Sequence, residues 1–307
     1  SPVNPQLGAK VLVGESELDF ALPGALPLVW QRQYSSYVNA EQGAACGALG
    51  HGWKLPQHIS LELGDESCLL LDAAGRVIRF EPLAVGQQHY SASEDLWLLR
   101  GGGDATWASQ PRWAHVPASL AANADAVLAA SGQADVLWVF APAPAAPAAL
   151  LTQRWRLIAQ LDRFGRTDGV GRRYRLHYQR LHRGKPAQGL LQADDGWRLQ
   201  GVDLIHDPVG SGALPLNLVR YGYSAAGDLT SVHDRAGVLM REFEYEHHRI
   251  VAHRQQAGPW HRYRYESAQP GARVIEHSNQ QGLGYRFEYL SQRPSPEGQL
   301  RRLTRVT

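Results

Sequence analysis

The sequence predicts an all-β protein made of antiparallel β-hairpins, and three observations predict it. Several segments alternate apolar and polar residues with the period of two that a strand requires. Short turns that contain Gly, often of the form Asp-x-x-Gly, separate these segments. Beyond residue 217 the strands recur at a spacing of about 20 residues, which is typical of repeats that build one continuous sheet.

The composition allows a large core and excludes several classes of protein. The chain has 307 residues, 44% of them hydrophobic, which is enough for one large domain or two ordinary ones. The 31 basic and 29 acidic residues nearly cancel, so we expect no nucleic-acid partner. We also expect no cleaved leader and no membrane helix, since no apolar run approaches the roughly 18 residues that a span requires. Cys46 and Cys68 are too few for a disulfide framework, although they could form one bridge.

The first 60 residues are rich in Gly and Pro and contain the first predicted strand. This strand covers residues 28–34 and alternates so that Trp30, Arg32 and Tyr34 share one face. A Gly-rich loop, GALGHGWKLP, follows it. Further strands are predicted at 59–63, 68–71 and 77–80, with a turn at 72–75.

The segment 101–150 carries a weaker signal and is predicted to be an irregular, loop-rich connection. Residues 119–132 are rich in Ala, which favours a short helix, but their β neighbours also allow a loose strand. The Pro/Ala run at 141–151 excludes a helix and a central strand, so we predict a surface loop there. After it, strands are predicted at 154–161, 172–179, 198–206 and 216–223, with an irregular insertion at 181–196.

A repeat becomes countable from residue 217 onward. Aromatic-x-aromatic pairs recur at intervals of 22, 20 and 24 residues, and short strands that end in His keep step with them. Each unit is predicted to be a hairpin that is stable only when neighbours stack on it. In the turn at 234–237, Asp234 can hydrogen-bond its own turn and Gly237 supplies a positive φ. The aromatic pairs are Tyr221/Tyr223, Phe243/Tyr245, Tyr263/Tyr265 and Phe287/Tyr289, and the histidines are His233, His253 and His277.

The opposite face of the same strands carries charges. Glu242, Glu244 and Glu246 share one side of a strand, and Arg262 and Arg264 share one side of the next. Opposite charges on neighbouring strands contribute about 0.2–1 kcal/mol per pair. We therefore predict a sheet with an aromatic face and an ion-paired face, and either face could be the inner one.

These residues resemble a known family. VRYGYSAAGDLTSVHDRAG and VLMREFEYEHHRIVAH resemble the YD repeats of Rhs (rearrangement hotspot) proteins. PVNPQLGAK, DFALPGALPLVWQRQYSS, GALGHGWKLP and DAAGRVIRFEP resemble the domain that precedes such repeats in bacterial Rhs effectors. The repeats depart from the consensus Tyr-Asp, because Ser224, Glu246 and Glu266 follow the second aromatic residue.

The resemblance implies a shell. In this family the repeats wind into a large hollow β-barrel, or cocoon, which encloses a carboxy-terminal toxin domain, and an amino-terminal plug-like domain helps to close one end. Residues 1–100 would be the plug-like domain, 101–150 the connection and 151–307 the beginning of the YD-repeat shell. This piece would be a scaffold without catalytic residues or a cofactor, with the toxin and the second self-cleavage site of the family farther along the polypeptide.

The resemblance also implies partners and a route. Many members are made in the bacterial cytoplasm and carried by a spike protein of the type VI secretion system, with a chaperone, into a target cell during interbacterial competition. The rest of the same polypeptide and a cleaved amino-terminal segment would be further partners. Some members are cleaved before Pro-Val-x-x-x-x-Gly-x-Lys, which Pro2, Val3, Gly8 and Lys10 match. A chain that starts at Ser1 agrees with such a cut, although an arbitrary boundary would look the same.

The 13 histidines raise the question of a metal or catalytic site, but their pattern favours a structural role. A structural position in a repeat carries the same residue type in successive copies, as His does here. We expect the same structural role for His247 and His248. Zinc needs three or four converging ligands, and neither Cys-x-x-Cys nor His-Glu-x-x-His occurs in the sequence. We therefore expect no metal site.

Other side chains leave a second function open, a carbohydrate-binding or glycan-hydrolysing β protein. Carboxylates could work as an acid–base pair, and exposed Trp rings could stack on sugars, but turn and core positions are the favoured reading for both. Cys46 could be a reactive thiol, although an inert one is favoured, and Ser1 is a remote candidate for an amino-terminal nucleophile. The residues concerned are Asp162, Asp168, Asp194 and Asp195 and Trp30, Trp53, Trp155 and Trp197.

Overall fold

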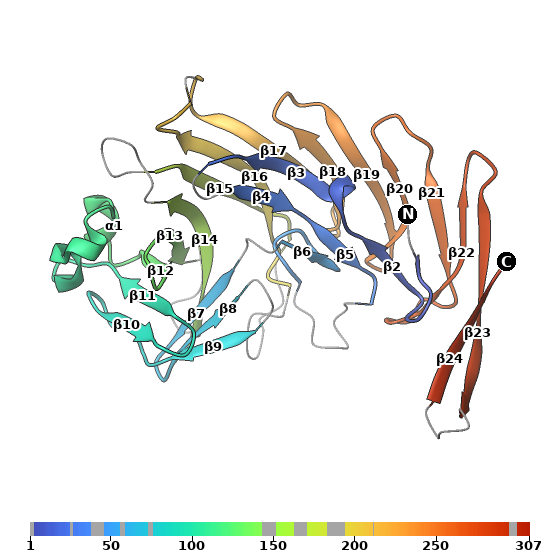
Figure 1. Ribbon diagram of the computed structural model, residues 1–307, viewed down its shortest axis with the longest axis horizontal. Helices are drawn as coiled ribbons and strands as arrows, with labels where there is room; N and C mark the ends of the chain where they lie inside the picture. The colour runs from blue at the N-terminus through green and yellow to red at the C-terminus, as the bar shows by residue number, and fades with distance from the viewer. Residues whose placement is uncertain are drawn as a thin grey trace.

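The regular structure is almost entirely antiparallel β, as the sequence predicts (Figure 1). One long curved sheet is lined by a smaller group of strands from the amino-terminal part of the chain (Figure 1). None of the described helices is long and apolar enough to cross a membrane. The computed structural model describes residues 3–24, 27–37, 46–55, 59–72, 76–142, 152–162, 171–182, 194–210, 212–294 and 300–307.

The long sheet has 18 strands among the described residues. Its main run, from β10 to β24, is a meander in which each strand pairs antiparallel with the next one along the chain. Short connections are sufficient for such a meander, because antiparallel neighbours need only a tight turn. The strands are β10 (Gln88–Ser91), β11 (Leu96–Arg100), β12 (Val127–Ser131), β13 (Val136–Pro142), β14 (Thr152–Asp162), β15 (Arg173–Arg180), β16 (Trp197–His206), β17 (Leu216–Tyr223), β18 (Leu229–Asp234), β19 (Leu239–Glu246), β20 (Arg249–Gln255), β21 (His261–Tyr265), β22 (Val274–Asn279), β23 (Gly284–Pro294) and β24 (Leu300–Val306).

The sheet forks at β14. One end of this strand, from Ala159 to Leu161, pairs with β15, and the other end, from Thr152 to Trp155, pairs with β7. Three strands of the amino-terminal part thereby join the long sheet: β7 (Ser60–Gly64), β8 (Cys68–Leu71) and β9 (Val77–Phe80). The described strands β11 to β14 belong to one continuous sheet, and the division of the chain into three regions stays a prediction.

The region 101–150 contains more regular structure than the predicted loop-rich connection. Its first part has only short helices, but β12 and β13 continue the long sheet. The Ala-rich stretch 119–132 therefore includes both a helical turn and a strand. The predicted loop at 141–151 begins later, because β13 extends to Pro142, and the rest of it lies outside the described residues. The helices are η3 (Thr106–Ser109), η4 (Pro111–Trp113) and α1 (Ala118–Ala121).

A second group of strands, which we call the inner layer, comes from the first 54 residues. It consists of a four-stranded sheet and a hairpin: β1 (Val3–Asn4), β2 (Ala9–Leu12), β5 (Gln33–Ser35) and β6 (Trp53–Lys54), and β3 (Leu18–Leu22) with β4 (Leu28–Gln31), preceded by η1 (Glu15–Glu17). The single strand predicted at 28–34 is wrong, since it is split between β4 and β5. The break falls at Arg32, whose amide donates to the Glu17 carbonyl instead of to a ladder partner (2.9 Å). The predicted alternation holds, because Trp30, Arg32 and Tyr34 are all buried.

The turns of the repeats form as the turn chemistry predicts. The Asp234 Oδ1 atom accepts hydrogen bonds from the amides of Ala236 (2.8 Å) and Val238 (2.9 Å), and Gly237 has a φ of 79°. Asn279 caps the equivalent turn between β22 and β23 with the same pattern. The related turn predicted at 72–75 extends beyond the described residues.

A β-bulge recurs at one position of the repeat. The register shifts immediately before the aromatic residue in β15, β17, β19 and β21. A bulge bends the strand that carries it and increases the local right-handed twist. Repetition at every second strand therefore bends the sheet progressively, in agreement with the curved wall in Figure 1. The residues that follow the bulges are Tyr178, Tyr223, Tyr245 and Tyr265.

Candidate functional site: the inner face of the repeat sheet

The aromatic face of the repeat sheet is its inner face, and the inner layer packs against it (Figure 1). Tyr221, Phe243 and Tyr263 are 4%, 3% and 5% exposed. Trp30 and Trp53 of the inner layer belong to the same core cluster as the first two of these. The direction of the aromatic face, which the sequence leaves open, is thus set by contacts with the amino-terminal residues.

Tyr221 holds the β3–β4 hairpin. Its hydroxyl accepts a hydrogen bond from Trp30 Nε1 (2.9 Å) and donates one to Asp19 Oδ2 (2.6 Å). Phe20 stacks on the Trp30 ring, with 5.6 Å between the centroids. Burial raises the pKa of Tyr221, which therefore keeps its proton and can serve as both donor and acceptor.

Phe243 and Tyr245 hold the strand that follows the Gly-rich loop. Trp53 donates from Nε1 to the Tyr245 hydroxyl (2.8 Å) and meets Phe243 edge to face, with 5.1 Å between the centroids. Gly52 is required before this Trp, since its φ is +78° and a Cβ atom would lie 2.6 Å from Tyr34 Cε2. The Tyr34 hydroxyl in turn accepts a hydrogen bond from the amide of Ile250 in β20 (3.0 Å).

The first strands of the chain pack against the next repeat. Val3 belongs to a small cluster with Tyr263, Val274 and Phe287, and Lys10 Nζ lies 4.6 Å above the Tyr263 ring. The Gly8 carbonyl accepts a hydrogen bond from the Val274 amide (2.8 Å). Gly8 has a φ of +68°, and a Cβ atom there would lie 2.5 Å from Arg273 Cβ. Three residues of the sequence motif thus sit against the repeat sheet, and the fourth, Pro2, lies outside the described residues.

The remaining tyrosines of the repeat use their hydroxyl groups within the sheet. Tyr265 donates to the Ile250 carbonyl (2.9 Å), and Tyr289 and Tyr223 donate to the carbonyls of Val274 and Leu199. Each acceptor lies on an earlier strand of the sheet. These hydrogen bonds tie strands of the wall to one another, although Tyr223 and Tyr265 also have partners in the amino-terminal part, the Ala48 carbonyl (3.5 Å) and Ser36.

A cluster of buried ionised side chains joins the inner layer to β19. Arg32 lies between Glu17 (3.1 Å) and Asp19 (2.8 Å), and Arg241 of β19 also pairs with Glu17. The side chains of all four are at most 5% exposed. Sequence reasoning missed the two acidic residues, although ESELDF places them two positions apart beside apolar neighbours.

Burial dominates the ionisation of this cluster. It raises the pKa of Glu17 and Asp19 in spite of the nearby arginines. It lowers the pKa of Lys10 to about 7, against the attraction of Glu17. Burial also disfavours the charge of Arg32, but Asp19 and Glu17 outweigh this effect and raise the pKa of that guanidinium. The cluster is therefore expensive to break, because removal of one partner leaves another charge unpaired in the core.

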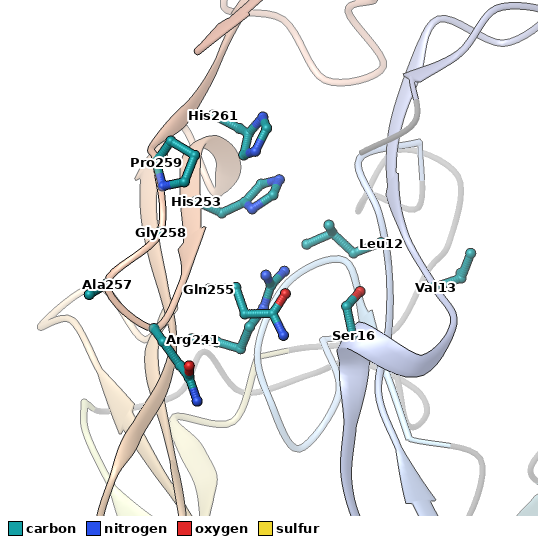
Figure 2. A pocket seen from close by; sticks show the side chains of 11 residues that line it. Leu12, Val13, Ser16, Arg241, His253, Gln255, Ala257, Gly258, Pro259 and His261 are labelled. Atoms are coloured by element: carbon teal, nitrogen blue, oxygen red, sulfur yellow. The ribbon is translucent and has the colours of Figure 1, made fainter. Parts of the chain in front are cut away.

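A cavity of about 620 Å³ lies next to this cluster, between the inner layer and the repeat sheet (Figure 2). Leu12 and Ser16 form one wall, and Arg241, His253 and His261 form the other. Burial lowers the pKa of both histidines, which are therefore neutral at pH 7. Among the described residues of this lining, Arg241 is the only charged side chain, and it is already paired with Glu17.

The histidines of the repeat pack as rings. His253 Nε2 lies 3.1 Å from the Tyr263 hydroxyl, and the His277 ring stacks on Tyr263 with 4.7 Å between the centroids. Burial lowers the pKa of His277 to about 4. His233 is half-buried on β18. His247 and His248 form the turn between β19 and β20 with positive φ values of 51° and 60°.

The carboxylates considered for catalysis are held by other groups. Asp194 accepts two hydrogen bonds from Arg198 (both 2.8 Å), and Asp195 pairs with Arg154 (2.7 Å) and Arg156. Burial alone would raise the pKa of both carboxyls, but these partners lower it, so both are ionised and neither can donate a proton. Asp162 accepts from the Arg172 amide (3.2 Å). Asp168 lies outside the described residues.

Three of the four tryptophans considered for sugar binding belong to the core, and Trp197 is partly buried. Trp30, Trp53 and Trp155 are 1%, 3% and 2% exposed, and the Arg156 guanidinium lies 5.2 Å from the centroid of Trp197. None of the four presents a bare ring to solvent.

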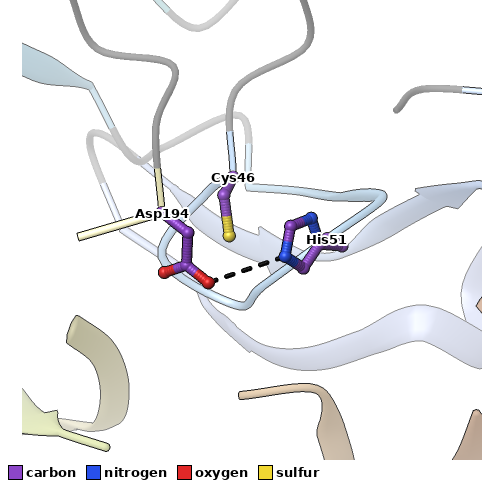
Figure 3. Close-up of side chains that lie close together, drawn as sticks. All are labelled: Cys46, His51 and Asp194. Carbon is purple, nitrogen blue, oxygen red and sulfur yellow. Dashed lines mark ion pairs between the residues drawn. The ribbon is translucent and has the colours of Figure 1, made fainter. Parts of the chain in front are cut away.

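Cys46 lies in a cluster that sequence spacing does not reveal. The thiol, His51 and Asp194 place ligand-type atoms within 4.8 Å of one another (Figure 3). Burial raises the pKa of the Cys46 thiol to about 12, so the side chain is not a nucleophile at neutral pH. Cys46 and Cys68 are both free thiols.

The outer face carries the predicted ion pairs. Three of them link neighbouring strands, and one reaches across β20 from β21 to β19. The neighbouring pairs are Arg254 with Glu242, Arg264 with Glu276 (2.7 Å) and Arg305 with Glu288 (3.0 Å), and the longer one is Arg262 with Glu244 (3.1 Å). Exposed pairs of this kind contribute about 0–1 kcal/mol each. They keep the outer face polar rather than supplying most of the stability.

Comparison with known proteins agrees with this arrangement. A family model described as a domain of unknown function, DUF6531, matches residues 1–80. The chain is 39% identical over 297 residues to the toxin protein Tse5 of Pseudomonas aeruginosa, with 89% of this chain and 21% of that protein covered. It is 36% identical over 100 residues to the double-stranded DNA deaminase toxin A of Burkholderia cenocepacia, with 33% of this chain and 7% of that protein covered.

The chain thus spans about a fifth of the length of Tse5. Among solved structures, TcdB2-TccC3-Cdc42 matches with a TM-score of 0.36 and 13% identity, over 94% of this chain and 16% of that one. This likeness is too low to bear on the fold. The similarity to two toxin proteins, the matched amino-terminal model and the hairpin repeats agree with one another and support the amino-terminal region of an Rhs-type effector.

Proposed function

We propose that this chain is part of the encapsulating shell of a secreted Rhs toxin and encloses a carboxy-terminal toxin domain for delivery by type VI secretion in interbacterial competition. Residues 151–307 form the first part of the shell wall, residues 1–100 act as the plug-like domain, and residues 101–150 connect them. The protein is made in the bacterial cytoplasm and exported into a target cell with a spike protein and a chaperone.

One observation carries this proposal. Successive repeats present aromatic side chains to the inside of a curved sheet, and the amino-terminal residues lie there. Polypeptide on the inner face is thus held by Trp30 and Trp53 through hydroxyl groups of the wall. A continuous sheet of this kind also leaves few free strand edges, which would otherwise promote aggregation.

The motif at the amino terminus supports processing there. Gly8 and Lys10 are fixed against the repeat sheet by a backbone hydrogen bond and by contact with Tyr263. A cut ahead of Pro2 would therefore leave Val3, Gly8 and Lys10 attached to the shell while the preceding segment separates.

The carbohydrate-binding alternative receives no support from the described residues. Its Trp rings are buried or covered by Arg156, and the carboxylates Asp194 and Asp195 are neutralised by arginines. We expect no binding at micromolar strength to a glycan panel.

Limited proteolysis of the full polypeptide tests the enclosure. We expect the carboxy-terminal toxin domain to resist digestion in the native protein and to be digested after deletion of residues 1–60, because the deletion opens one end of the shell. Glu288→Gln, a change on the outer face, should leave the protection unchanged. Equal digestion of the toxin domain in the native polypeptide and in isolation would contradict the proposal.

A further inference from the structure

We propose that the cavity between the inner layer and the repeat sheet binds a carboxylate attached to an apolar group, with Arg241 Nε and His253 Nδ1 as the hydrogen-bond donors (Figure 2). The cavity measures about 620 Å³, which lies within the roughly 300–1,000 Å³ that is usual for ligand sites. The proposal does not depend on whether the shell encloses a toxin.

The first argument is that two buried nitrogen atoms of the lining have no hydrogen-bond partner. Arg241 donates from Nη2 to Glu17, and its Nε atom has no partner. His253 Nε2 lies 3.1 Å from the Tyr263 hydroxyl, and its Nδ1 atom has no partner. Arg241 and His253 are only 4% and 3% exposed. Buried polar atoms are nearly always hydrogen-bonded, so we expect both nitrogens to bond to a group that enters the cavity.

The second argument is the placement of the two nitrogens on neighbouring strands. Arg241 in β19 opposes Gln255 in β20, and His253 lies two residues before Gln255, so Arg241 and His253 are diagonal neighbours on one face. Diagonal neighbours lie about 7–8 Å apart, which one carboxylate with two acceptor oxygens can bridge. With the Tyr263 hydroxyl donating to Nε2, the neutral imidazole of His253 carries its proton on Nδ1 and donates from there.

The third argument is the charge of the buried cluster beside the cavity. A bound carboxylate would add a negative charge to this cluster, which a water molecule at the same nitrogens would not do. A carboxylate also suits one excess positive charge better than a phosphate group, which carries about −1.5 to −2. The buried cluster contains three basic side chains and two acidic ones, namely Lys10, Arg32, Arg241, Glu17 and Asp19.

The described acidic side chains nearby do not take this role. None of the described residues that line the 620 Å³ cavity is acidic. Glu15 and Asp234 line a smaller cavity of about 130 Å³, which shares Arg241 with the larger one. Asp234 accepts hydrogen bonds from the amides of its own turn, and Glu15 is exposed, so that solvent ions screen its charge.

Apolar side chains of the lining define the rest of the ligand. Leu12 extends from β2 toward His253, and Pro259 lines the cavity from the turn between β20 and β21 (Figure 2). An aliphatic group between them would be removed from water while the carboxylate is fixed by the two nitrogens. The ligand class is therefore an aliphatic carboxylic acid or the carboxyl end of a peptide whose last residue is aliphatic.

Three probes that differ by one group test the site on the 307-residue chain. N-acetylleucine has a carboxylate beside a peptide group, 4-methylpentanoate has a carboxylate without a peptide group, and N-acetylleucinamide has no carboxylate. We expect N-acetylleucine to bind about tenfold or more tightly than the amide, because only the acid makes charge-assisted hydrogen bonds. Titrations followed by backbone amide chemical shifts at low salt measure the affinities. Weaker binding of 4-methylpentanoate than of N-acetylleucine supports a peptide end as the ligand, and equal binding supports a free acid.

A conservative variant tests the assigned donor. Arg241→Lys removes the Nε donor but keeps a cation for Glu17, so the affinity for N-acetylleucine should fall about tenfold or more. Arg254→Lys, the same change on the outer face of β20, is the matched control and should leave the affinity unchanged.

A second variant keeps the test decisive if Arg241→Lys perturbs the fold, which far-ultraviolet circular dichroism would detect. Ser16→Trp, at an exposed position of the lining, should block the cavity and weaken binding without removing a buried charge. The proposal fails if no probe binds to the native chain or if the amide binds as tightly as the two acids. It also fails if Arg241→Lys folds normally and binds N-acetylleucine as tightly as the native chain, or if Ser16→Trp does so.

Discussion

Two pairs of tyrosines from the aromatic pairs of the repeat differ in the partners of their hydroxyl groups. Tyr221 and Tyr245 bond to Trp30 and Trp53 of the inner layer. Tyr265 and Tyr289 donate to carbonyls of an earlier strand, and Tyr265 has Ser36 as a second partner. The repeats share one sequence pattern, so the difference comes from what lies in front of each strand. Tyrosine hydroxyls therefore stabilise the repeat sheet itself. At Tyr221 and Tyr245 the same kind of side chain binds the inner layer.

The largest effect is expected when the aromatic anchor of the inner layer, Trp53, is removed. Trp53→Ala should lower the free energy of unfolding by about 3–5 kcal/mol, because it deletes a buried ring between Phe243 and Tyr34. Urea denaturation measures the change. Tyr285→Ala, at a residue that is 40% exposed on β23, is the control and should cost less than half as much. Equal losses of unfolding free energy would mean that Trp53 stabilises the fold no more than a partly exposed ring of the repeat sheet does.

The buried ion pairs come next. Glu17→Gln should cost about 3 kcal/mol, because it leaves Arg32 and Arg241 without their shared carboxylate in the core. Glu288→Gln removes the partner of Arg305 on the outer face, where both side chains are about 60% exposed, and should cost at most about 1 kcal/mol. The two midpoints of thermal unfolding provide the comparison. A Glu17→Gln midpoint equal to that of Glu288→Gln would show that the buried ionic cluster stabilises the fold no more than an exposed ion pair does.

A pH effect follows from Lys10. Its pKa in the folded protein is about 7, below the ordinary value of 10.5, so between these values the unfolded chain binds more protons. Stability should therefore rise with pH, by about 1–2 kcal/mol from pH 7 to 8.5. Lys10→Met should abolish this part of the rise, and urea denaturation at both pH values measures it. Above about pH 9, the raised pKa values of buried thiols and tyrosines act in the opposite direction, so the window ends below that. A rise of the same size in Lys10→Met would contradict the assignment.

The smallest effect distinguishes the two uses of the tyrosines most directly. Tyr221→Phe and Tyr265→Phe should each cost about 1 kcal/mol, since each loses one hydrogen-bonding hydroxyl. Combined with Trp30→Phe, however, only Tyr221→Phe should show a coupling energy, of about 0.5–1 kcal/mol, because only this hydroxyl contacts Trp30. Coupling between Tyr265 and Trp30 would show that the inner layer acts on the whole wall.

Most of the fold could be predicted from the sequence, because its signals are local. The period of two, the turn at Asp234 and the spacing of the aromatic pairs all depend on residues within one hairpin. The inner direction of the aromatic face could not be predicted, since it depends on contacts such as Trp53 with Tyr245, which are 192 residues apart. The break at Arg32 was missed for the same reason, because alternation alone does not show that the Arg32 amide bonds to Glu17.

The cluster at Asp194 is the extreme case. Cys46 and Asp194 approach each other only through the folding of two separate connections, and neither carries a spacing motif. The residues of the ionic cluster left a partial signal, two acids two positions apart beside apolar neighbours, which a search for buried charges could have used.

The long separation of these partners has a consequence for synthesis on the ribosome. Trp30 leaves the ribosome long before Tyr221, its partner 191 residues later, and Glu17 waits still longer for Arg241, 224 residues away. The segment made first is therefore among the last to be completed, and its indole rings and charges stay unsatisfied while the wall is translated. Nascent chains of this kind expose apolar surface for seconds, which is when assistance against aggregation matters most.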